Sequence, residues 1–553
     1  MLSSTILLAL LPALVFASPV EIEKRANASA YAGSTTSDIF PPTGTSVNSP
    51  LFPGETGVGY PGVTMTGVES DAIQTAAAYA YNDGASGQFP LVADEPKGSS
   101  NSSSVDIFKY WGNLSPWFSV PSSFYGLPDA SPLVPENCSI TQVHLLYRHG
   151  ARYPTTGAAP SAFATRLHNI TGGFSATGDL AFLNTWTYKL GAELLTPFGR
   201  LQNFELGVAF RQQYGELLNN FTVQGALPVF RTESQDRMVK TAENFAAGFF
   251  GVPEYMSEVN IEIAVEAPGF NITGAPYEAC PNSNIAKYGS VGSTAAAAFA
   301  NNAFNSTIAR LQAELTGYKL TPTDAIAMLQ LCSYETDALG YSAFCTLFTE
   351  EDFKNYEYYY DISFYYNNGF GSPVGAAQGK GYLEEFVARF TQTPITSYDS
   401  TTNSTLDSNP TYFPLNQSIY ADATHEVVLL DVFTAFNLTA LGKTGPLPLT
   451  ARTDNSSFVA SQVVPFATHM VIQVLECKDM SPTKQIRFII NDAVLPIDES
   501  YAGCPKNDAG LCSFDTVVSA LQKRITQIDF NHACNGNYTV TPGKDYNGLA
   551  PTS

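Results

Sequence analysis

The spacing of apolar and polar residues predicts alternating strands and helices beyond about residue 105. The apolar run Val143–Tyr147 is typical of a buried strand, and Pro228–Phe230 of a shorter one. Gln485–Ile490 and Val494–Leu495 are expected to pair as strands across a tight turn. Strands that alternate with helical segments indicate packed α/β layers, so α/β is the expected fold class.

Helical spacing of apolar residues recurs between these strands. Ser293–Leu331 is expected to hold two helical segments, separated by Gly317 and a turn at Pro322. The tyrosine-rich stretch Tyr356–Tyr366 is interpreted as the packing of a buried helix rather than as a surface for a ligand. The other expected helices are Arg200–Leu218, which follows Thr196–Gly199, then Met238–Phe250 and Val427–Phe436.

Candidate chemistry begins with the heptapeptide Arg148–Pro154 (RHGARYP), which directly follows the first predicted strand. Two arginines flank His149, and nearby positive charge makes an imidazole harder to protonate. This setting suits a nucleophile, because Arg148 and Arg152 can hold phosphate oxygens while the ring of His149 takes the phosphoryl group. The alternative, a solvated basic turn, does not account for five fixed positions in one short stretch.

Three more residues complete the candidate site. Arg231 follows a predicted strand, as His149 does, and is a candidate for a third phosphate-binding arginine. His425 and Glu426 directly precede an apolar helix, whose first backbone N–H groups would lie near a bound phosphate. His425 could donate to a phosphate oxygen, and Glu426 could protonate the leaving oxygen and later activate water. Taken singly, a surface arginine, a helix cap and a solvated carboxylate explain the same residues.

Other classes of site lack their signatures in this sequence. His425 and Glu426 do not form a zinc-protease motif, because the position four residues after His425 is Leu429. The six histidines have no metal-ligand spacing, and the sequence contains neither a Walker lysine loop nor a G-x-S-x-G turn. We therefore expect neither a metal nor a cofactor, and we interpret His144 and His469 as structural histidines.

The N-terminus predicts secretion. Residues 1–17 have the short apolar run of a signal peptide, residues 18–25 resemble a pro-segment with a dibasic end, and residues 26–105 form an extension rich in Ser, Thr, Gly and Pro. Eight widely spaced cysteines without a C-x-x-C pair predict four disulfides, whose pairing the spacing leaves open. N-glycosylation sequons include those at Asn113, Asn169, Asn220, Asn271, Asn403 and Asn537.

The charge balance narrows the range of partners. The chain carries 50 acidic and 28 basic residues, a net charge of −22, which argues against binding to nucleic acid. No run beyond the signal peptide is long and apolar enough to span a membrane, so no membrane partner is expected. A phosphate pocket must be locally basic against this overall field, and the acidic composition suggests work at low pH. The expected partner is a small-molecule phosphate monoester, and nothing in the sequence fixes an oligomeric state.

Together these motifs resemble the histidine acid phosphatases, and among them the secreted fungal phytase branch. The resemblance spans roughly Pro135–Cys534, and its motifs occur in the same order as in fungal phytases. They are Arg148–Thr155, Leu195–Gly199, Gln378–Tyr382, Phe413–Asn416, Tyr420–Asp422, Val464–Ala467 and Asn491–Asp492.

The resemblance implies a fold and a set of roles. The fold would be a phosphoglycerate-mutase-like α/β domain over residues 106–274 and 406–540, with a smaller helical domain over 275–405. His149 would form a phosphohistidine, and His425 would lie beside the scissile phosphate. The phosphate itself would be bound by Arg148, Arg152 and Arg231. The cysteines would pair as Cys138–Cys477, Cys280–Cys534, Cys332–Cys345 and Cys504–Cys512.

Two departures from the family pattern bear on function. Glu426 stands where the family has aspartate, so its carboxyl group reaches one methylene farther, and Asp422 is a weaker candidate for the acid. Phytase-type pockets carry extra lysines, whereas Thr155–Thr165 and Asp361–Tyr366 contain no basic residue and only Lys380 offers a partial substitute. A neutral pocket predicts broad phosphomonoesterase activity with a reduced preference for inositol hexakisphosphate.

Two alternatives stay open. One is a phosphoglycerate-mutase-like transferase, against which the signal peptide and the cysteines argue. The other is a secreted glycoprotein that keeps the fold but binds phosphorylated ligands without cleaving them. Glu426 favours this second alternative, and the intact set Arg148, His149 and Arg152 argues against it. The sequence thus favours a secreted, metal-independent acid phosphatase.

Overall fold

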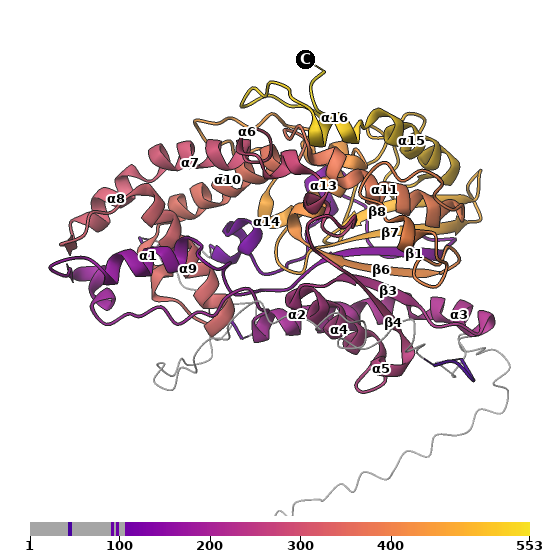
Figure 1. Ribbon diagram of the computed structural model, residues 1–553, viewed down its shortest axis with the longest axis horizontal. Coiled ribbons are helices and arrows are strands. Elements are labelled where there is room, and N and C mark those ends of the chain that lie inside the picture. The colour runs from indigo at the N-terminus through magenta and orange to yellow at the C-terminus, as the bar shows by residue number, and fades with distance from the viewer. Residues whose placement is uncertain (1–41, 47–89, 93–95, 99–104, 553) are drawn as a thin grey trace, which may run out of the picture.

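A mixed β-sheet forms the centre of the computed structural model, which describes residues 42–46, 90–92, 96–98 and 105–552 (Figure 1). The predicted signal peptide and pro-segment, and most of the predicted extension, lie outside the described residues. The strand order is β10-β8-β7-β1-β6-β3-β4, with β9 paired to β8. Strands β1, β6, β3 and β4 pair in parallel, whereas β7 pairs antiparallel with β1 and β8.

Strands β1 and β3 extend beyond the apolar stretches Val143–Tyr147 and Pro228–Phe230 from which they were predicted. Apart from the central sheet, a two-stranded sheet pairs β2 (Ser175–Ala176) with β5 (Leu315–Thr316). Parallel strands place their carboxyl ends at one edge of a sheet, which makes β1, β3 and β6 the strands most relevant to a site. The central sheet consists of β1 (Cys138–Arg148), β3 (Val229–Glu233), β4 (Asn260–Ala264), β6 (Ile419–Thr424), β7 (His469–Cys477), β8 (Lys484–Ile490), β9 (Ala493–Val494) and β10 (Cys512–Ser513).

Helices cover both faces of the central sheet (Figure 1). On one face α2 packs against α4, and on the other α11 packs against α13 and α15. These helices confirm the segments predicted from apolar spacing between residues 200 and 250 and after residue 426. The helices around the sheet are α2 (Pro197–Tyr214), α3 (Leu218–Gln224), α4 (Asp236–Phe250), α5 (Tyr255–Glu258), α11 (Gly375–Thr391), α13 (Glu426–Ala435), α15 (Phe514–Gln527) and α16 (Phe530–Asn535).

A second group of helices extends from one end of the sheet, on the left in Figure 1. In this group α7 packs against α10, and α1 packs against α9. The tyrosines of α10 are buried as predicted, except for the half-buried Tyr359, and Tyr356 and Tyr365 are fully enclosed. The remaining helices of the chain's described part are α1 (Ala159–His168), α6 (Ala286–Gly289), α7 (Val291–Ala303), α8 (Asn305–Gln312), α9 (Pro322–Leu339), α10 (Glu350–Asn367), α12 (Ser404–Asp407) and α14 (Ala460–Val463).

The packing of the helices does not follow the expected domain boundaries. Helix α11 lies within the expected helical range 275–405, yet it packs on α13 and α15, and its Phe386 and Phe390 contact His144 of β1. Helix α1 lies outside that range but packs on α9. The expected range rests on the family resemblance, which implies a helical part but not the element on which each helix packs.

The loop after β1 and the start of α2 approach each other closely at two glycines. A Cβ on Gly150 would clash with the carbonyl oxygen of Gly199, and a Cβ on Gly199 would clash with that of Ala151. Thr196 caps α2 by accepting a hydrogen bond from the backbone N–H of Gly199 at 3.0 Å. The side chain of Gln202 accepts one from the backbone N–H of Ala151 at 2.8 Å. The start of α2 therefore fixes the loop that carries the candidate nucleophile.

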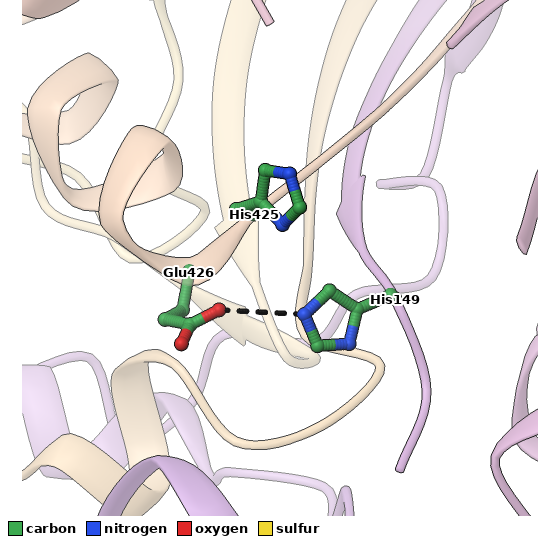
Figure 2. A group of neighbouring side chains, drawn as sticks. All are labelled: His149, His425 and Glu426. Carbon is green, nitrogen blue, oxygen red and sulfur yellow. Dashed lines mark ion pairs between the residues drawn. The ribbon is translucent and has the colours of Figure 1, made fainter. Parts of the chain in front are cut away.

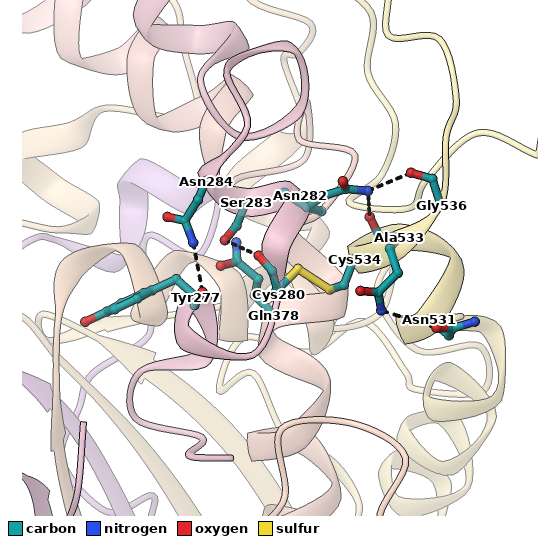
Figure 3. Close-up of a disulfide and its surroundings, with 12 residues drawn as sticks. Tyr277, Cys280, Asn282, Ser283, Asn284, Gln378, Asn531, Ala533, Cys534 and Gly536 are labelled. Carbon is teal, nitrogen blue, oxygen red and sulfur yellow. Dashed lines mark hydrogen bonds between the residues drawn. A yellow bond between two sulfur atoms is a disulfide. The ribbon is translucent and has the colours of Figure 1, made fainter. Parts of the chain in front are cut away.

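Four disulfides confirm the pairing that the resemblance implied. Figure 3 shows Cys280–Cys534, which ties the turn before α6 to α16. Beside it, the side-chain amide of Asn282 donates to the carbonyl oxygens of Ala533 and Gly536 at 2.8 and 2.9 Å. The other three are Cys138–Cys477, Cys332–Cys345 and Cys504–Cys512.

One of the predicted glycosylation sequons is buried. The side chain of Asn113 donates to a carboxylate oxygen of Glu426 at 3.2 Å, and the residue is 6% exposed. A glycan cannot be attached there in the folded chain, because the amide nitrogen is out of reach. By contrast, Asn169 and Asn220 are exposed. Among the described residues, no helix is long and apolar enough to cross a membrane.

Candidate active site

His149 directly follows β1, at the carboxyl edge of the parallel strands. Its Nδ1 lies 2.8 Å from the carbonyl oxygen of Gly150, and because a carbonyl only accepts, Nδ1 carries the proton. The lone pair is then on Nε2, which lies 3.5 Å from a carboxylate oxygen of Glu426 (Figure 2). Burial lowers the pKa of His149 well below its ordinary value, and the charges of Arg148 and Arg237 lower it further against the pull of Glu426. The ring is therefore neutral in acid, as a nucleophile requires.

Arg148 is the last residue of β1 and is fully buried. Its Nε donates to Glu426 at 3.0 Å, and its Nη1 donates to the carbonyl oxygens of Asn113 and Val464. The ring of Phe466 covers the guanidinium, with 4.4 Å between its centroid and Cζ. Burial lowers the pKa of Arg148 to about 10, so the group stays charged in acid. Its Nη2 has no hydrogen-bond partner within the described part of the chain.

Two further arginines bring charge to the same place. Nη1 of Arg152 donates to the carbonyl oxygen of Tyr153 at 2.9 Å, and Tyr334 of α9 also hydrogen-bonds this guanidinium. Arg237, in the first turn of α4, donates to Glu193 at 3.3 Å, and its charge acts on both histidine and arginine side chains of the site. The Nε atoms of Arg152 and Arg237 are buried without a partner in the described residues. The three arginines thus keep unpaired N–H groups beside a neutral imidazole.

His425 precedes α13 and contributes a second ring. The centroids of His425 and His149 are 5.6 Å apart, and their planes lie at 72°. Nε2 of His425 lies 2.6 Å from Glu233 at the end of β3. Burial lowers the pKa of His425, but the charge of Glu233 and hydrogen bonds to Glu233 and Glu266 raise it to about 9. One histidine of the site is therefore neutral and the other is a cation.

Glu426 begins α13 and reaches the nucleophile despite replacing a shorter residue. Its Oε2 accepts from Arg148, and its Oε1 accepts from the side chain of Asn113. Burial would raise the pKa of Glu426, but the charges of Arg148 and Arg152 hold it well below its ordinary value. The group is a carboxylate in the resting site, and it lies where a phosphate would have to bind.

Arg231 does not join this group, contrary to the sequence-based expectation. Its Nη2 donates to Glu385 at 2.9 Å and to Thr273 at 3.1 Å, and its Nε lies 3.4 Å from Glu262 and 3.6 Å from Asp422. Three carboxylates already surround the guanidinium, so an incoming phosphate would have to displace them. The predicted strand ended before Arg231, but β3 continues to Glu233, and Arg231 is therefore a residue within the sheet.

Two other candidate positions, and Asp361 in the stretch without basic residues, already have partners within the chain. Lys380, considered as a substitute phosphate ligand, lies 3.1 Å from Asp399 and 3.6 Å from Glu384. Asp422, the weaker candidate for the acid, forms an ion pair with Arg389. Asp361 of α10 is buried and accepts from a backbone N–H. None of these side chains is available for a substrate.

The two histidines interpreted as structural have packing contacts in the structure. His144 stacks on Tyr420 at 4.6 Å, and burial lowers its pKa to about 3. His469 stacks on Trp117 at 5.5 Å, and its Nδ1 lies 3.2 Å from the carbonyl oxygen of Ala467. Both rings therefore serve as parts of the core.

Two sets of ligand-type side chains lie close enough together to hold a cation, but the charge around the first set and the protonated ring of the second argue against one. In each set the ligand atoms lie within 4.8 Å of one another. Three arginines bring positive charge to the first set, and in the second the imidazole is itself protonated, whereas metals bind the neutral ring. The sets are His149, His425 and Glu426, and Glu233, Glu266 and His425.

Sequence reasoning missed several residues of the site. Arg237 was detectable, because it follows a strand end and lies in the first turn of a helix, where anions bind. Glu233 and Glu266 carry no motif, and Asn113 and Tyr334 reach the site from segments far away in the sequence. Only the fold brings these four residues together with His149.

A neutral imidazole, three guanidinium groups and an imidazolium together fit the needs of phosphoryl transfer through histidine. The sequence family described as the histidine phosphatase superfamily (branch 2) matches residues 139–491. Phytase A of Aspergillus oryzae is 34% identical over 434 residues, covering 74% of this chain and 87% of its own length. Phytase A of Neurospora crassa is 30% identical over 470 residues, covering 74% and 89%.

Solved structures agree on the fold. The phytase from D. castellii has a TM-score of 0.61 at 24% identity and covers 79% of this chain and 89% of its own. The Bifidobacterium longum multiple inositol polyphosphate phosphatase, in complex with inositol hexasulfate, has a TM-score of 0.52 at 13% identity, with 75% and 97% covered. The chain belongs to the histidine phosphatase superfamily (branch 2) and is a phosphomonoester hydrolase of that family, as the sequence predicted.

Proposed function

We propose that this protein is a secreted acid phosphatase that hydrolyses phosphate monoesters, inositol hexakisphosphate among them, through a phosphohistidine at His149. One observation carries the proposal. The lone pair of His149 Nε2 lies beside the guanidinium groups of Arg148, Arg152 and Arg237, whose buried N–H groups lack partners in the described residues. Such donors match the oxygens of a phosphoryl group.

In the first step a monoester binds as its monoanion and competes with Glu426 for Arg148. Once phosphate shares the charge of Arg148, the pKa of Glu426 rises, and Glu426 takes the proton of the monoanion. Nε2 of His149 attacks phosphorus, the P–N bond forms and the bond to the ester oxygen breaks. Glu426 gives its proton to the leaving oxygen, so the alcohol departs neutral.

In the second step water attacks the phosphohistidine. Glu426, again a carboxylate, takes a proton from the water, and the electrons of the P–N bond return to Nε2 of His149. Glu426 then passes the proton to the departing phosphate. His425 remains a cation throughout and stabilises phosphate oxygens next to the arginines. Every step uses side chains of this chain alone.

The range of substrates follows from the number of cations in the pocket. Arg148, Arg152, Arg237 and His425 suffice for one phosphoryl group, and Lys380 is already paired with carboxylates. The other phosphates of a polyphosphorylated ring would meet no dedicated lysines. We therefore expect a broad phosphomonoesterase that accepts inositol hexakisphosphate without strong preference.

Secretion belongs to the same proposal. Four disulfides link the chain, as is typical of proteins from oxidising compartments, and the curated relatives are fungal. The alternative of a non-cleaving binding protein loses its main support, because the carboxyl group of Glu426 is within 3.5 Å of His149.

Initial rates at about pH 5 test the proposed activity. An aryl phosphate and inositol hexakisphosphate are compared in the presence of a chelator, with His149→Ala and with His168→Ala, an exposed histidine, as the matched control. We expect turnover of both esters by the wild type and the control, with comparable kcat/KM, and none by His149→Ala. A wild type inactive on both esters would contradict the proposal, and a strong preference for inositol hexakisphosphate would contradict its substrate range.

A further inference from the structure

Two carboxyl groups that have no part in the proposed reaction steps lie next to His425. Glu233 is the last residue of β3, and Glu266 follows β4, the parallel neighbour of β3. Their carboxylate oxygens lie 2.6 and 3.7 Å from Nε2 of His425. All three side chains are at most 5% exposed, and the carboxyl ends of β3, β4 and β6 bring them together. Negative groups this close to a phosphate site need a reason, because they repel the substrate.

The two carboxyls differ in how they are held. Glu266 accepts from the hydroxyl of Tyr277 at 2.7 Å and from the side chain of Gln235 at 2.5 Å. Neither oxygen of Glu233 has such a donor in the described residues; its contacts are the ion pair with His425 and a hydrogen bond with Glu266. Burial raises the pKa of Glu233 to about 8, whereas at Glu266 the hydrogen bonds with His425, Glu233 and Tyr277 outweigh burial and lower the pKa to about 2. In acid the pair carries one negative charge and one proton.

The orientation of the His425 ring explains why the negative charge of the two glutamates matters for phosphate binding. Nε2 of His425 lies 2.6 Å from a carboxylate oxygen of Glu233, and its other ring nitrogen is on the side facing His149 and Glu426 (Figure 2). A neutral ring that donates to Glu233 would present a lone pair to a phosphate oxygen, which repels it. Only the doubly protonated ring can bind Glu233 and donate to phosphate at the same time. Two further charged groups face this ring: Arg237 opposes that protonation, and the carboxylate of Glu426, already paired with Arg148, lies within 4.8 Å of it.

We propose that Glu233 and Glu266 are a pair of positioning residues that share one negative charge and use it to hold His425 as a cation, with one N–H bound to Glu233 and the other free for a phosphate oxygen. The role of His425 toward phosphate rests on the proposed function. The protonation of His425 by the pair does not, since it is a property of the free protein.

Because Glu233 and Glu266 share one negative charge, replacing one of them by glutamine should have a different effect from replacing both. In Glu233→Gln the anion of Glu266 remains, and in Glu266→Gln the anion of Glu233 forms readily because its repelling neighbour is gone. Each single variant should therefore keep His425 charged in mild acid. In the double variant the pair has no anion left, and because the nearby carboxylate of Glu426 is already paired with Arg148, burial and Arg237 bring the ring to its neutral form.

NMR titration of isotope-labelled histidines measures this directly, without substrate. We expect the pKa of His425 to be near 9 in the wild type and above about 6.5 in both single variants. In the double variant we expect the pKa of His425 to lie at least about 2 units below the wild-type value. Glu335→Gln is the matched control, a buried glutamate that accepts from Ser342 and Trp186 away from the site. A double variant in which His425 still titrates above 8 would overturn the proposal, as would a single variant with the full effect.

Kinetics at pH 6 supply the second readout. The double variant should lose at least about tenfold more kcat/KM than the product of the two single losses, because only it lacks the charge. A purely structural role would give additive losses and an unchanged titration, which contradicts the proposal. If the wild type hydrolyses no ester, the proposed function fails while the titration still decides the role of the pair.

A single variant keeps the proposal testable if the double variant does not fold. In Glu233→Gln the carboxyl that ionises near pH 8 is gone, so the signals of His425 should show the step of the ring alone, still above about 6.5, without the second step that Glu233 adds in the wild type. A ring that is already neutral at pH 6 in folded Glu233→Gln would overturn the proposal.

Discussion

Glu426 meets two opposing demands. Arg148 holds it as a carboxylate in the resting site, yet the leaving oxygen needs a proton from it. Competition between phosphate and Glu426 for Arg148 reconciles the two, because the substrate itself then raises the pKa of Glu426 when the acid is needed. The glutamate is long enough for this exchange, since one side chain contacts both Arg148 and His149.

Replacing Glu426 by Gln should therefore act through the leaving group. An inositol ester has a poor leaving group and should lose about 10²-fold or more in kcat, whereas a nitrophenyl ester, which needs little protonation, should lose less than about tenfold. Steady-state rates on both esters check this, with Glu426→Asp as the control that retains an acid. Equal losses on the two esters would contradict the role of Glu426 as proton donor.

Arg237 and Arg231 lie six residues apart and should respond oppositely to removal. Arg237→Ala removes a phosphate ligand and should lower kcat/KM roughly 10- to 100-fold with little change in Tm. Arg231→Ala leaves Glu385 and its neighbours unpaired in the core, so it should destabilise the fold by about 3–5 kcal/mol while the folded fraction keeps its kcat/KM. Kinetics and calorimetry on both variants measure these losses. A large loss of kcat/KM in Arg231→Ala, with a mainly structural effect in Arg237→Ala, would show that Arg231 and not Arg237 binds phosphate.

The residues of the site were predictable where the chemically active side chains lie close together in the sequence. Arg148, His149 and Arg152 share one loop, and His425 and Glu426 share one helix start, so a short motif reveals each set. The apolar run that ends at Phe230 predicted Arg231 as the third arginine, and Arg237 was missed. The side chains that extend β3 to Glu233 are polar, and burial by ion pairs is invisible to an apolar pattern.

At the scale of elements, the contact between α2 and the loop after β1 sets the position of His149. The loop and the helix touch through backbone atoms at Gly150 and Gly199, so neither position has room for a side chain. The sequence indicates a turn and a helix start there, but the close approach itself appears only when the two segments are seen together.

Gly199→Ala tests this contact. The added Cβ would push against the carbonyl oxygen of Ala151, so we expect a loss of stability of about 1–3 kcal/mol and a fall in kcat with KM little changed. Gly215→Ala, at the other end of α2, is the control, because its Cβ would meet only the flexible side chain of Arg211. Equal effects of the two substitutions on kcat would show that the contact does not position the nucleophile.

For the whole molecule, the distribution of acid groups matters more than their number. The net charge of −22 was readable from the sequence, but the burial of many carboxyl groups was not. Burial raises the pKa of Glu262, Glu357 and Glu385 to about 7 each, although arginines or backbone N–H groups oppose it. Between their unfolded pKa near 4.5 and these folded values the native state binds more protons than the unfolded state, so stability falls as pH rises.

Groups whose pKa is lowered in the folded state affect the stability of the protein at low pH. Glu266 titrates at about 2 and Asp422 also titrates below its ordinary value, so their contribution is present above the unfolded pKa near 4 and is lost as pH falls toward 2. Tm should therefore be highest near pH 4–5 and decline by several degrees toward pH 8, as calorimetry across that range will measure. In Glu262→Gln the alkaline decline should be shallower, while Glu499→Gln, at an exposed glutamate, should leave it unchanged. A Tm that rises from pH 5 to 8 would contradict this account.

The covalent intermediate tests the central claim most directly. A ³²P-labelled monoester is mixed with the protein at about pH 5, quenched in alkali within milliseconds to preserve a P–N bond, and digested for peptide mapping. We predict label on the peptide that contains His149, absent from His149→Ala and present in the exposed-histidine control His168→Ala. Hydrolysis of the ester without label on any peptide, or with label elsewhere than His149, would contradict the mechanism.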